Sequence, residues 1–365
     1  MTASARVSLC LLLSVAGTSS GLAQQAPPTA PDVALTPALR NEVIEGAIKQ
    51  LNASYVFPDV AKQMEAAIRK RAANHEYDQI TSPKAFVDIL TVHLREVSHD
   101  KHLGVMYSAS PLPPLPPPNG QPSPEQRERA LGFGRAINFG FEKVERLAGN
   151  VGYLRLGGFF PPDMGAETAA AAMTFVANTD ALIIDLRWNN GGDPAMVAFI
   201  STYLFNESTH LNDIYWRPDS TTRQWWTLPH VPGKRFQGKD VYVLTSKRTF
   251  SAGEEFTNNL KVLKRATIVG DTTGGGANPG GPRPINDHFA VWVPSGRAIN
   301  PVTKSNWEGT GVIPDIPVGE GIALETAYLA ALEKLAPGAT NPMLVSQIKK
   351  AADSVRAELG KKGSP

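Results

Sequence analysis

The sequence predicts a mixed α/β (α+β) fold, in which a small N-terminal helical bundle precedes a larger domain built on a mostly parallel sheet. Two observations support this prediction. From residue 37 to about residue 105, apolar residues recur at three- and four-residue spacing, the pattern of amphipathic helices. After a proline-rich break, short apolar runs alternate with helical stretches, which is typical of βαβ units.

The N-terminal part is expected to hold three helices over residues 37–106. The stretches "NEVIEGAIKQLNASYVF" and "DVAKQMEAAIRKRAANH" carry the helical spacing. The third, "SPKAFVDILTVHLREV", opens with Ser82 before Pro83, a good helix start. The stretch "PLPPLPPPNGQPSPEQ" then indicates an exposed, polyproline-like linker over residues 107–128.

The larger domain is expected over residues 129–337, with a C-terminal helix or tail over residues 338–365. The apolar runs predict strands at residues 150–156, 181–188, 240–246, 266–270 and 288–294. The stretches between and after them predict helices at residues 164–178, 193–205, 251–263 and 323–336. In such sheets, chemistry gathers where strands end and helices begin.

The N-terminal stretch "MTASARVSLCLLLSVAGTSSGLAQQ" is typical of a secretory signal, with an apolar run from Val7 to Gly17 and cleavage expected after Ala23. Residues 24–36 are expected to be a disordered lead-in. We therefore expect an exported protein, periplasmic or secreted. The single cysteine, Cys10, lies inside the signal, so disulfides, thiol catalysis and cysteine-ligated metal are excluded for the mature chain.

The composition bounds the possible partners. The chain is 42% hydrophobic and 19% charged, which is enough apolar content for a substantial core. Its net charge of +2 does not indicate binding to nucleic acid or to an anionic membrane. No later segment of the sequence is long and apolar enough to predict a membrane span.

Ser251 in "TFSAGEE" has two readings. A serine followed three residues later by a glutamate is the capping-box pattern, and on these residues alone the cap is favoured. A serine between a strand and a helix would also expose its hydroxyl as a nucleophile and offer the Ala252 N–H to an oxyanion. The α/β-hydrolase elbow is excluded, because Thr249 stands where that motif needs glycine.

Two further stretches are candidates for chemistry. In "DLRWNNGG" the glycine pair before a helix start is either an anion cradle or an ordinary turn, and Asp185 and Arg187 are expected to be a structural charge pair. In "SHDKHL" the two histidines, His99 and His102, are three residues apart with an acid between them. Without a third obvious ligand we predict no metal site, and a surface histidine is the plainer interpretation of each.

Taken together, "LIIDLRWNNGG", "LTSKRTFSAGEEFTNNLK…RATIVGDTTGGG" and "WEGTGVIPDIPV" resemble the C-terminal-processing (tail-specific) peptidase family. The closer resemblance is to the branch that contains the tricorn core protease and the interphotoreceptor retinoid-binding protein. It spans roughly residues 41–335, including a helical N-terminal domain typical of retinoid-binding-protein-like members. For the larger domain it implies a crotonase-like, ClpP-like ββα fold.

The resemblance implies a role for each matching residue. Ser251 matches the family's nucleophile, Gly191 or Gly192 matches the oxyanion donor, and the Ala252 N–H would be the second donor. His102 matches the general base of the tricorn-like branch, with His99 as second choice. The orienting glutamate is matched by Glu308. Such a base predicts activity that rises with pH through about 6 to 7.

The chain also departs from the family's pattern. The processing peptidases use a lysine base where this chain has Gly275, and Lys261 and Lys264 are expected to be solvated, so a Ser–Lys dyad is disfavoured. Lys101 stands where tricorn has a serine beside its histidine. No PDZ-like domain fits between Tyr107 and Asn150.

We therefore predict an exported serine peptidase that acts on peptides or unfolded chains without cofactor. An alternative is a non-catalytic binding protein for an apolar small ligand, and a third reading is a serine esterase. Retention of Ser251, His102 and Glu308 together favours the peptidase. The hairpin-like stretch 213–233, with Trp216, Trp225 and Trp226, would either line a groove or pack on the sheet. The sequence does not predict an oligomeric state.

Overall fold

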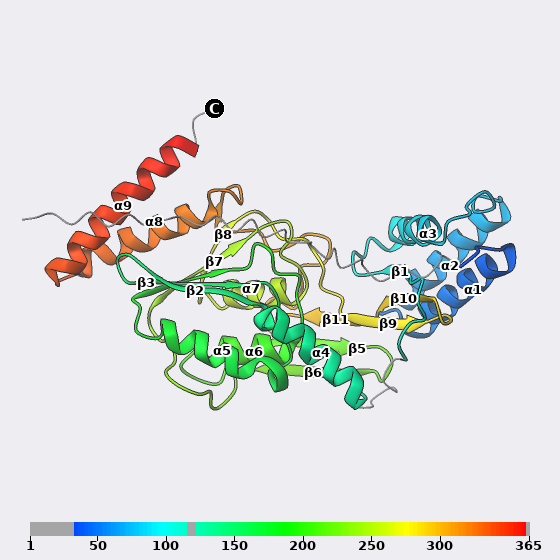
Figure 1. Cartoon of the computed structure of the whole chain (residues 1–365), viewed down its shortest axis with the longest axis horizontal. Coiled ribbons are helices and arrows are strands. Elements are labelled where there is room, and N and C mark those ends of the chain that lie inside the picture. Colours follow the sequence, from blue (N-terminus) through cyan, green and yellow to red (C-terminus); the bar gives the residue numbers. More distant parts are fainter. Residues whose placement is uncertain (1–32, 115–121, 363–365) are drawn as a thin grey trace, which may run out of the picture.

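The computed structural model describes residues 33–114 and 122–362 of the chain (Figure 1). The expected signal segment and most of the expected lead-in lie outside the described residues. Within those two ranges, none of the helices combines the length and the apolar character that crossing a membrane requires.

The N-terminal part holds the three expected helices, α1 (Pro37–Ser54), α2 (Pro58–Ala73) and α3 (Pro83–Ser98). Each begins with a proline, whose fixed φ suits the first helical turn. The side chains of Thr36 and Ser82 cap α1 and α3 by accepting hydrogen bonds from backbone N–H groups of the first turn.

These helices pack on a small antiparallel sheet whose strands come from distant parts of the chain. Its order is β1 (Gly104–Tyr107), β10 (Phe289–Pro294) and β9 (Gly280–Pro284). The residues of β10 that are buried in one cluster with the helices are Phe289, Val291 and Val293. The core of the helical unit therefore extends beyond residues 37–106, and Figure 1 shows this unit at one end of the molecule.

The larger domain is built on a six-stranded sheet in the order β12-β8-β7-β4-β3-β2. Every neighbouring pair except β2 with β3 is parallel, so the prediction of a mostly parallel sheet is confirmed. In chain order the strands are β2 (Phe141–Leu147), β3 (Val151–Leu156), β4 (Ala181–Asp185), β7 (Asp240–Thr245), β8 (Thr267–Gly270) and β12 (Ile316–Pro317).

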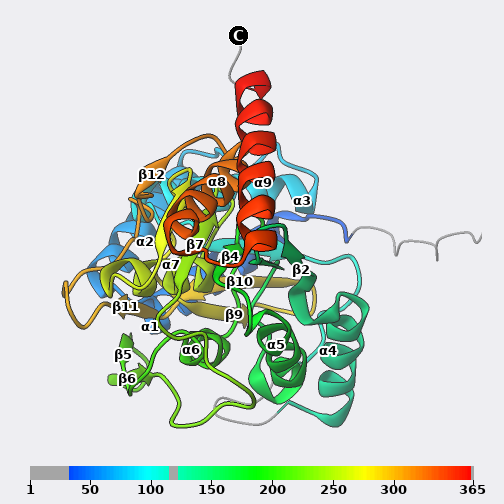
Figure 2. The same ribbon diagram turned by 90° about the vertical axis from the view of Figure 1, so that its left-hand side faces the viewer.

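Helices cover both faces of this sheet (Figures 1 and 2). On one face, α5 (Pro162–Val176), α6 (Pro194–Thr202) and α7 (Ala252–Val262) share a buried cluster with the strands. On the other face, α8 (Ala323–Leu335) and α9 (Pro342–Lys362) share a second buried cluster with the strands. Because β4 and β7 are parallel neighbours, the turns that follow them lie at the same edge of the sheet. This edge carries the candidate site.

A second antiparallel sheet lies against α7 and consists of β11 (Gly296–Ile299), β5 (His210–Trp216) and β6 (Thr221–Trp226). Its β5–β6 pair is the hairpin expected from the aromatic stretch.

Between β1 and β3, the described residues form α4 (Pro124–Ala136), a 3₁₀ turn (Asn138–Gly140) and β2, and no separate PDZ-like domain. Helix α4 begins before residue 128, the predicted end of the linker. The reason is that Ser123 forms a capping box directly ahead of Pro124. A second 3₁₀ turn (Ala336–Gly338) joins α8 to α9.

Candidate active site

Ser251 lies on the turn between β7 and α7, at the N-terminal end of the helix. Its backbone φ is 54° and its ψ is −121°, a strained conformation for a residue with a side chain. The turn is held by hydrogen bonds from Thr249 Oγ1 to the Leu186 carbonyl at 2.8 Å and from the Phe250 N–H to the Asn189 carbonyl at 2.9 Å. A strained serine on a strand–turn–helix crossover is the device that exposes the nucleophile in other hydrolases.

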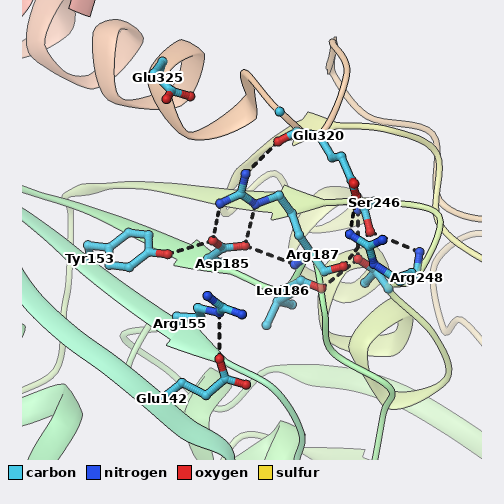
Figure 3. Close-up of polar contacts among 12 residues, drawn as sticks. Glu142, Tyr153, Arg155, Asp185, Leu186, Arg187, Ser246, Arg248, Glu320 and Glu325 are labelled. Carbon is cyan, nitrogen blue, oxygen red and sulfur yellow. Dashed lines mark hydrogen bonds and ion pairs between the residues drawn. The ribbon is translucent and has the colours of Figure 1, made fainter.

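Asp185 and Arg187 fix the neighbouring turn after β4 (Figure 3). The Arg187 guanidinium donates to both Asp185 oxygens, at 2.9 and 2.6 Å, and to the Glu320 carbonyl at 2.6 Å. The Tyr153 hydroxyl donates to Asp185 at 2.7 Å. These contacts agree with the structural role expected for the pair.

The glycines of "NNGG" bring backbone close to Ser251. A Cβ on Gly191 would lie 2.7 Å from the Ser251 Cβ, and the φ of Gly191 is 102°, so only glycine suits this position. The Gly191 N–H donates to Asn189 Oδ1 at 2.9 Å and is thus engaged. Among the described residues, the N–H groups of Gly192 and Ala252 have no acceptor. Of the predicted oxyanion donors, these two are free to bind a substrate oxygen.

The Glu254 carboxylate ties the nucleophile turn to the loop that follows β8. It accepts from the Ser251 N–H at 2.9 Å, which is one arm of the predicted capping box. It also accepts from Thr273 Oγ1 at 2.6 Å and from the N–H groups of Gly275 and Gly276 at 2.6 and 2.8 Å. Burial raises the pKa of Glu254, and these hydrogen bonds offset part of that effect.

The same loop is held from its other side by Trp307 and Glu308. Trp307 Nε1 donates to the Gly276 carbonyl at 2.8 Å, and the Ala277 N–H donates to Glu308 Oε2 at 2.5 Å. The loop over residues 273–277 therefore connects the Ser251 helix to the predicted orienting glutamate.

His102 lies on the segment between α3 and β1. Arg95 fixes this segment by donating to the carbonyls of Leu103 at 2.6 Å and Lys101 at 2.8 Å. The His102 side chain is only 9% exposed, and its ring packs on that of Phe250 with 4.5 Å between the ring centres. The imidazole thus contacts the residue directly before Ser251.

Asp100, His102 and Glu308 form a buried cluster whose ligand-type atoms lie within 4.8 Å of one another. His102 Nδ1 is 4.0 Å from Asp100 Oδ1, and neither ring nitrogen has a hydrogen-bond partner among the described residues. The Asp100 oxygens accept from the His102 N–H and Asn278 at 3.0 Å each and from Tyr55 at 3.3 Å. Glu308 Oε1 is buried and unpartnered, so it remains the acceptor open to the imidazole.

The pKa values of this cluster are shifted by its burial. Burial and then the Asp100 carboxylate raise the pKa of Glu308 to about 8, and the hydrogen bond from Ala277 offsets part of the shift. Burial, with a smaller contribution from Arg95, lowers the pKa of His102 to about 4. At neutral pH, His102 is therefore neutral and able to accept a proton, whereas Glu308 is mostly protonated.

The remaining base candidates lie elsewhere. His99 is exposed and ends α3 in the left-handed conformation, with φ of 55°. Lys261 is half-buried and forms an ion pair with Asp315. Of these base candidates, His102 is the one that belongs to the cluster with Glu308, although no hydrogen bond joins it to Ser251 in the described structure.

A cavity of about 490 Å³ opens beside Ser251, a size typical of ligand sites. Gly191, Gly192 and Ala252 also line it, as does Trp216 from the hairpin. Trp226 of the same hairpin is 42% exposed and stacks on His210, so only part of the aromatic stretch faces the cavity.

Sequence reasoning assigned no role in the site to Asp100, Glu254 or Glu255. Glu254 was visible only as the second half of a capping box, and its bonds to the distant loop had no local signal. Glu255 lines the cavity and is 4% exposed. Its position in the first turn of the helix that follows Ser251 was the available signal.

Comparison with known proteins identifies the family. Residues 150–318 match Peptidase family S41, and residues 23–134 match the N-terminal domain of peptidase S41 in eukaryotic IRBP. In fold, the chain is similar to a candidate peptidase from Parabacteroides merdae, with 19% identity, a TM-score of 0.56, and coverage of 83% of this chain and 99% of that one. It is also similar to a lipoprotein from Streptococcus agalactiae, with 13% identity, a TM-score of 0.53, and coverage of 83% and 100%. The two family matches together span most of the chain, which therefore belongs to peptidase family S41 and is a serine-type peptidase.

Proposed function

We propose that the protein is an exported serine peptidase in which Ser251 is the nucleophile, His102 the general base and Glu308 the carboxylate that stabilises the charged imidazole. Its substrates are peptides or unfolded chains, since a cavity of about 490 Å³ holds only a few residues at a time. The export part rests on the N-terminal apolar stretch alone.

The observation that carries this proposal is the conformation of Ser251. A non-glycine residue at φ of 54° and ψ of −121° is retained only where the surroundings impose it, and such residues cluster at functional sites. Ser251 also lines a cavity beside two N–H groups, those of Gly192 and Ala252, that lack acceptors among the described residues. A capping role requires neither the strain nor these free donors.

The chemistry follows from the arrangement. Ser251 Oγ attacks the carbonyl carbon of the peptide bond as its proton passes to His102, and the N–H groups of Gly192 and Ala252 stabilise the oxyanion. His102 then gives the proton to the leaving amine, and water hydrolyses the acyl-enzyme by the same route. Ionised Glu308 would fix the tautomer of His102 and stabilise its charged form.

His102 must approach Ser251 for this reaction. Catalytic hydrogen bonds are often long or absent without substrate and tighten in the complex. The rings of His102 and Phe250 are in contact, so the imidazole lies next to the nucleophile turn, and the reaction requires a rearrangement in which His102 reaches Ser251 Oγ.

A fluorophosphonate probe tests the proposal directly. The full-length mature protein should be labelled, and peptide mapping should locate the label on Ser251. The Ser251→Ala variant should remain unlabelled and should not hydrolyse an unfolded protein such as reduced casein. Absence of labelling in a folded wild-type protein, or a label on another serine, would contradict the assignment.

A further inference from the structure

The lining of the cavity beside Ser251 includes an acidic side chain that the proposed chemistry does not use. Glu255 is 4% exposed and lines the cavity, and its Oε1 atom has no hydrogen-bond partner among the described residues. An unpartnered buried carboxyl costs free energy of folding, and such groups persist mainly where a ligand or a reaction uses them.

A second acidic residue lines the same cavity. Asp193, at the N-terminus of α6, also lines the cavity, and its Oδ1 accepts from the Ala195 N–H at 2.7 Å. Within the described residues, no Lys, Arg or His forms an ion pair with Glu255 or Asp193. Two acids therefore face one space without a protein cation.

The electrostatics of this pair would change on binding a cationic group. Burial raises the pKa of Glu255 to about 8, the nearby Asn212 amide offsets part of that shift, and Asp193 adds to it. A positively charged ligand group would reverse the effect, because it favours the ionised form of a neighbouring carboxyl.

The walls suit a long side chain with a charged end. Phe159, Ile214, Trp216 and Ala298 give the cavity apolar sides. Lysine and arginine bury their methylene stems against such surfaces while their charged ends reach a polar group.

The separation of Ser251 and Glu255 also suits the length of such a side chain. Glu255 is in the first turn of α7, which begins directly after Ser251, so it lies about one helical turn, about 5 Å along the axis, from the nucleophile. A substrate held with its carbonyl at Ser251 could therefore reach Glu255 with the four-carbon stem of a lysine or the comparable stem of an arginine.

We propose that this cavity is a specificity pocket for a lysine or arginine side chain next to the scissile bond, with Glu255 as its main acceptor and Asp193 as the second negative charge. The proposal rests on the proposed function, since it takes Ser251 as the point of attack.

The test compares peptides that differ only in charge. Matched quenched peptides carry arginine or citrulline, or lysine or norleucine, at one position, and mass spectrometry locates the cut. We expect the wild-type protein to cut next to the cation, with kcat/KM for arginine at least about tenfold above that for citrulline. Glu255→Gln should bring this ratio close to one. Because the ratio is taken within each variant, a general loss of activity cancels.

The matched control is Glu207→Gln, which removes an exposed carboxyl away from the cavity and should leave the ratio unchanged. Equal rates on arginine and citrulline in the wild type, or a wild-type ratio in Glu255→Gln, would overturn the proposal.

A binding experiment separates this proposal from the proposed function. Ser251→Ala protein is titrated with the arginine and citrulline peptides by fluorescence anisotropy, which needs no turnover. Tighter binding of the arginine peptide, lost in Ser251→Ala/Glu255→Gln, supports the pocket even if the wild type neither labels nor hydrolyses. Equal affinities of Ser251→Ala for the arginine and citrulline peptides would contradict the proposed pocket even if the wild type is an active peptidase.

Discussion

Glu308 and His102 hold a carboxylate oxygen and a ring nitrogen within 4.8 Å of each other, and no hydrogen bond joins them. Glu308 Oε1 and both ring nitrogens of His102 are buried atoms, and none of them has a hydrogen-bond partner among the described residues. Two unsatisfied polar groups facing each other indicate a contact that closes when charge develops on the imidazole, as it does when a base accepts a proton.

The first prediction concerns the pH dependence of activity. The pKa of Glu308 is raised to about 8, so its anion is scarce below that pH and plentiful above it. The pKa of His102 is lowered to about 4, so the base is already neutral across this range. We therefore expect kcat/KM to rise with pH and reach a plateau above about 8, later than the 6 to 7 expected of an unperturbed histidine. A pH profile of the wild type checks this, and a plateau already reached at pH 6 would contradict it.

The second prediction is that Glu308→Gln lowers kcat by about 10²–10⁴-fold and removes the rise near pH 8, because the amide cannot ionise. Asp100→Asn is the informative comparison. Asp100 is 4.0 Å from His102 Nδ1, but its oxygens are engaged by other donors, so its loss should keep the rise. The rise should move to lower pH, because the Asp100 charge contributes to the raised pKa of Glu308. If Asp100→Asn abolished the profile and Glu308→Gln did not, the orienting role would belong to Asp100.

The third prediction links Glu308 to stability. Its folded-state pKa of about 8 lies above the ordinary value of 4.5, so the folded state binds more protons than the unfolded state between these values. Stability contributed by this group is therefore lost as pH rises from about 4.5 to about 8. Glu308→Gln should melt higher than the wild type at pH 9 and show less of this advantage at pH 5. Thermal melts at the two pH values check this, and an unchanged difference would contradict the raised pKa.

Local patterns predicted much of the fold. The three N-terminal helices and the alternation of strands and helices were readable because each is determined by short-range apolar spacing. The pairing of β1 with β10 could not be predicted from such spacing, because it joins residues 104 and 292, which are far apart in the sequence. The helical core is completed by that pairing, so the extent of the N-terminal unit could not be read from residues 37–106.

The residues of the candidate site also differ in whether local sequence patterns could predict them. Ser251 and the glycine pair were found from motifs at strand ends, and His102 and Glu308 only from family resemblance. The sequence showed Asp100 only as the acid between the two histidines, but its Oδ1 lies 4.0 Å from His102 Nδ1 because the chain turns after α3. The bonds of Glu254 to Gly275 and Gly276 span about twenty residues, and no local pattern predicts them.

The fourth prediction separates the two histidines. His102→Ala should lose almost all turnover, because among the described residues His102 is the only histidine in the cluster with Asp100 and Glu308. His99→Ala removes an exposed side chain at a helix end and should retain most activity. Both variants are compared by kcat on one peptide after circular dichroism has shown equal folding. Tolerance of both substitutions would remove the histidine base from the mechanism.

The last prediction concerns Glu254, which supports the site without touching the reacting atoms. One oxygen of its carboxylate accepts from Thr273 and Gly275, and the other from Ser251 and Gly276. Glu254→Gln keeps one acceptor oxygen but turns an NH₂ group toward at least one backbone N–H donor, and Glu254→Ala leaves all four donors without this acceptor. Leaving buried donors unsatisfied costs about 1–3 kcal/mol each, so we expect a loss of at least about 3 kcal/mol for the alanine variant and a smaller one for glutamine. Urea denaturation measures the free energy of unfolding of the two variants and so tests this order of stability.

Because the Glu254 carboxylate also holds the Ser251 turn, both variants should react more slowly with a fluorophosphonate under conditions where they remain folded. Labelling at the wild-type rate in a folded but destabilised variant would mean that Glu254 stabilises the loop without positioning the nucleophile.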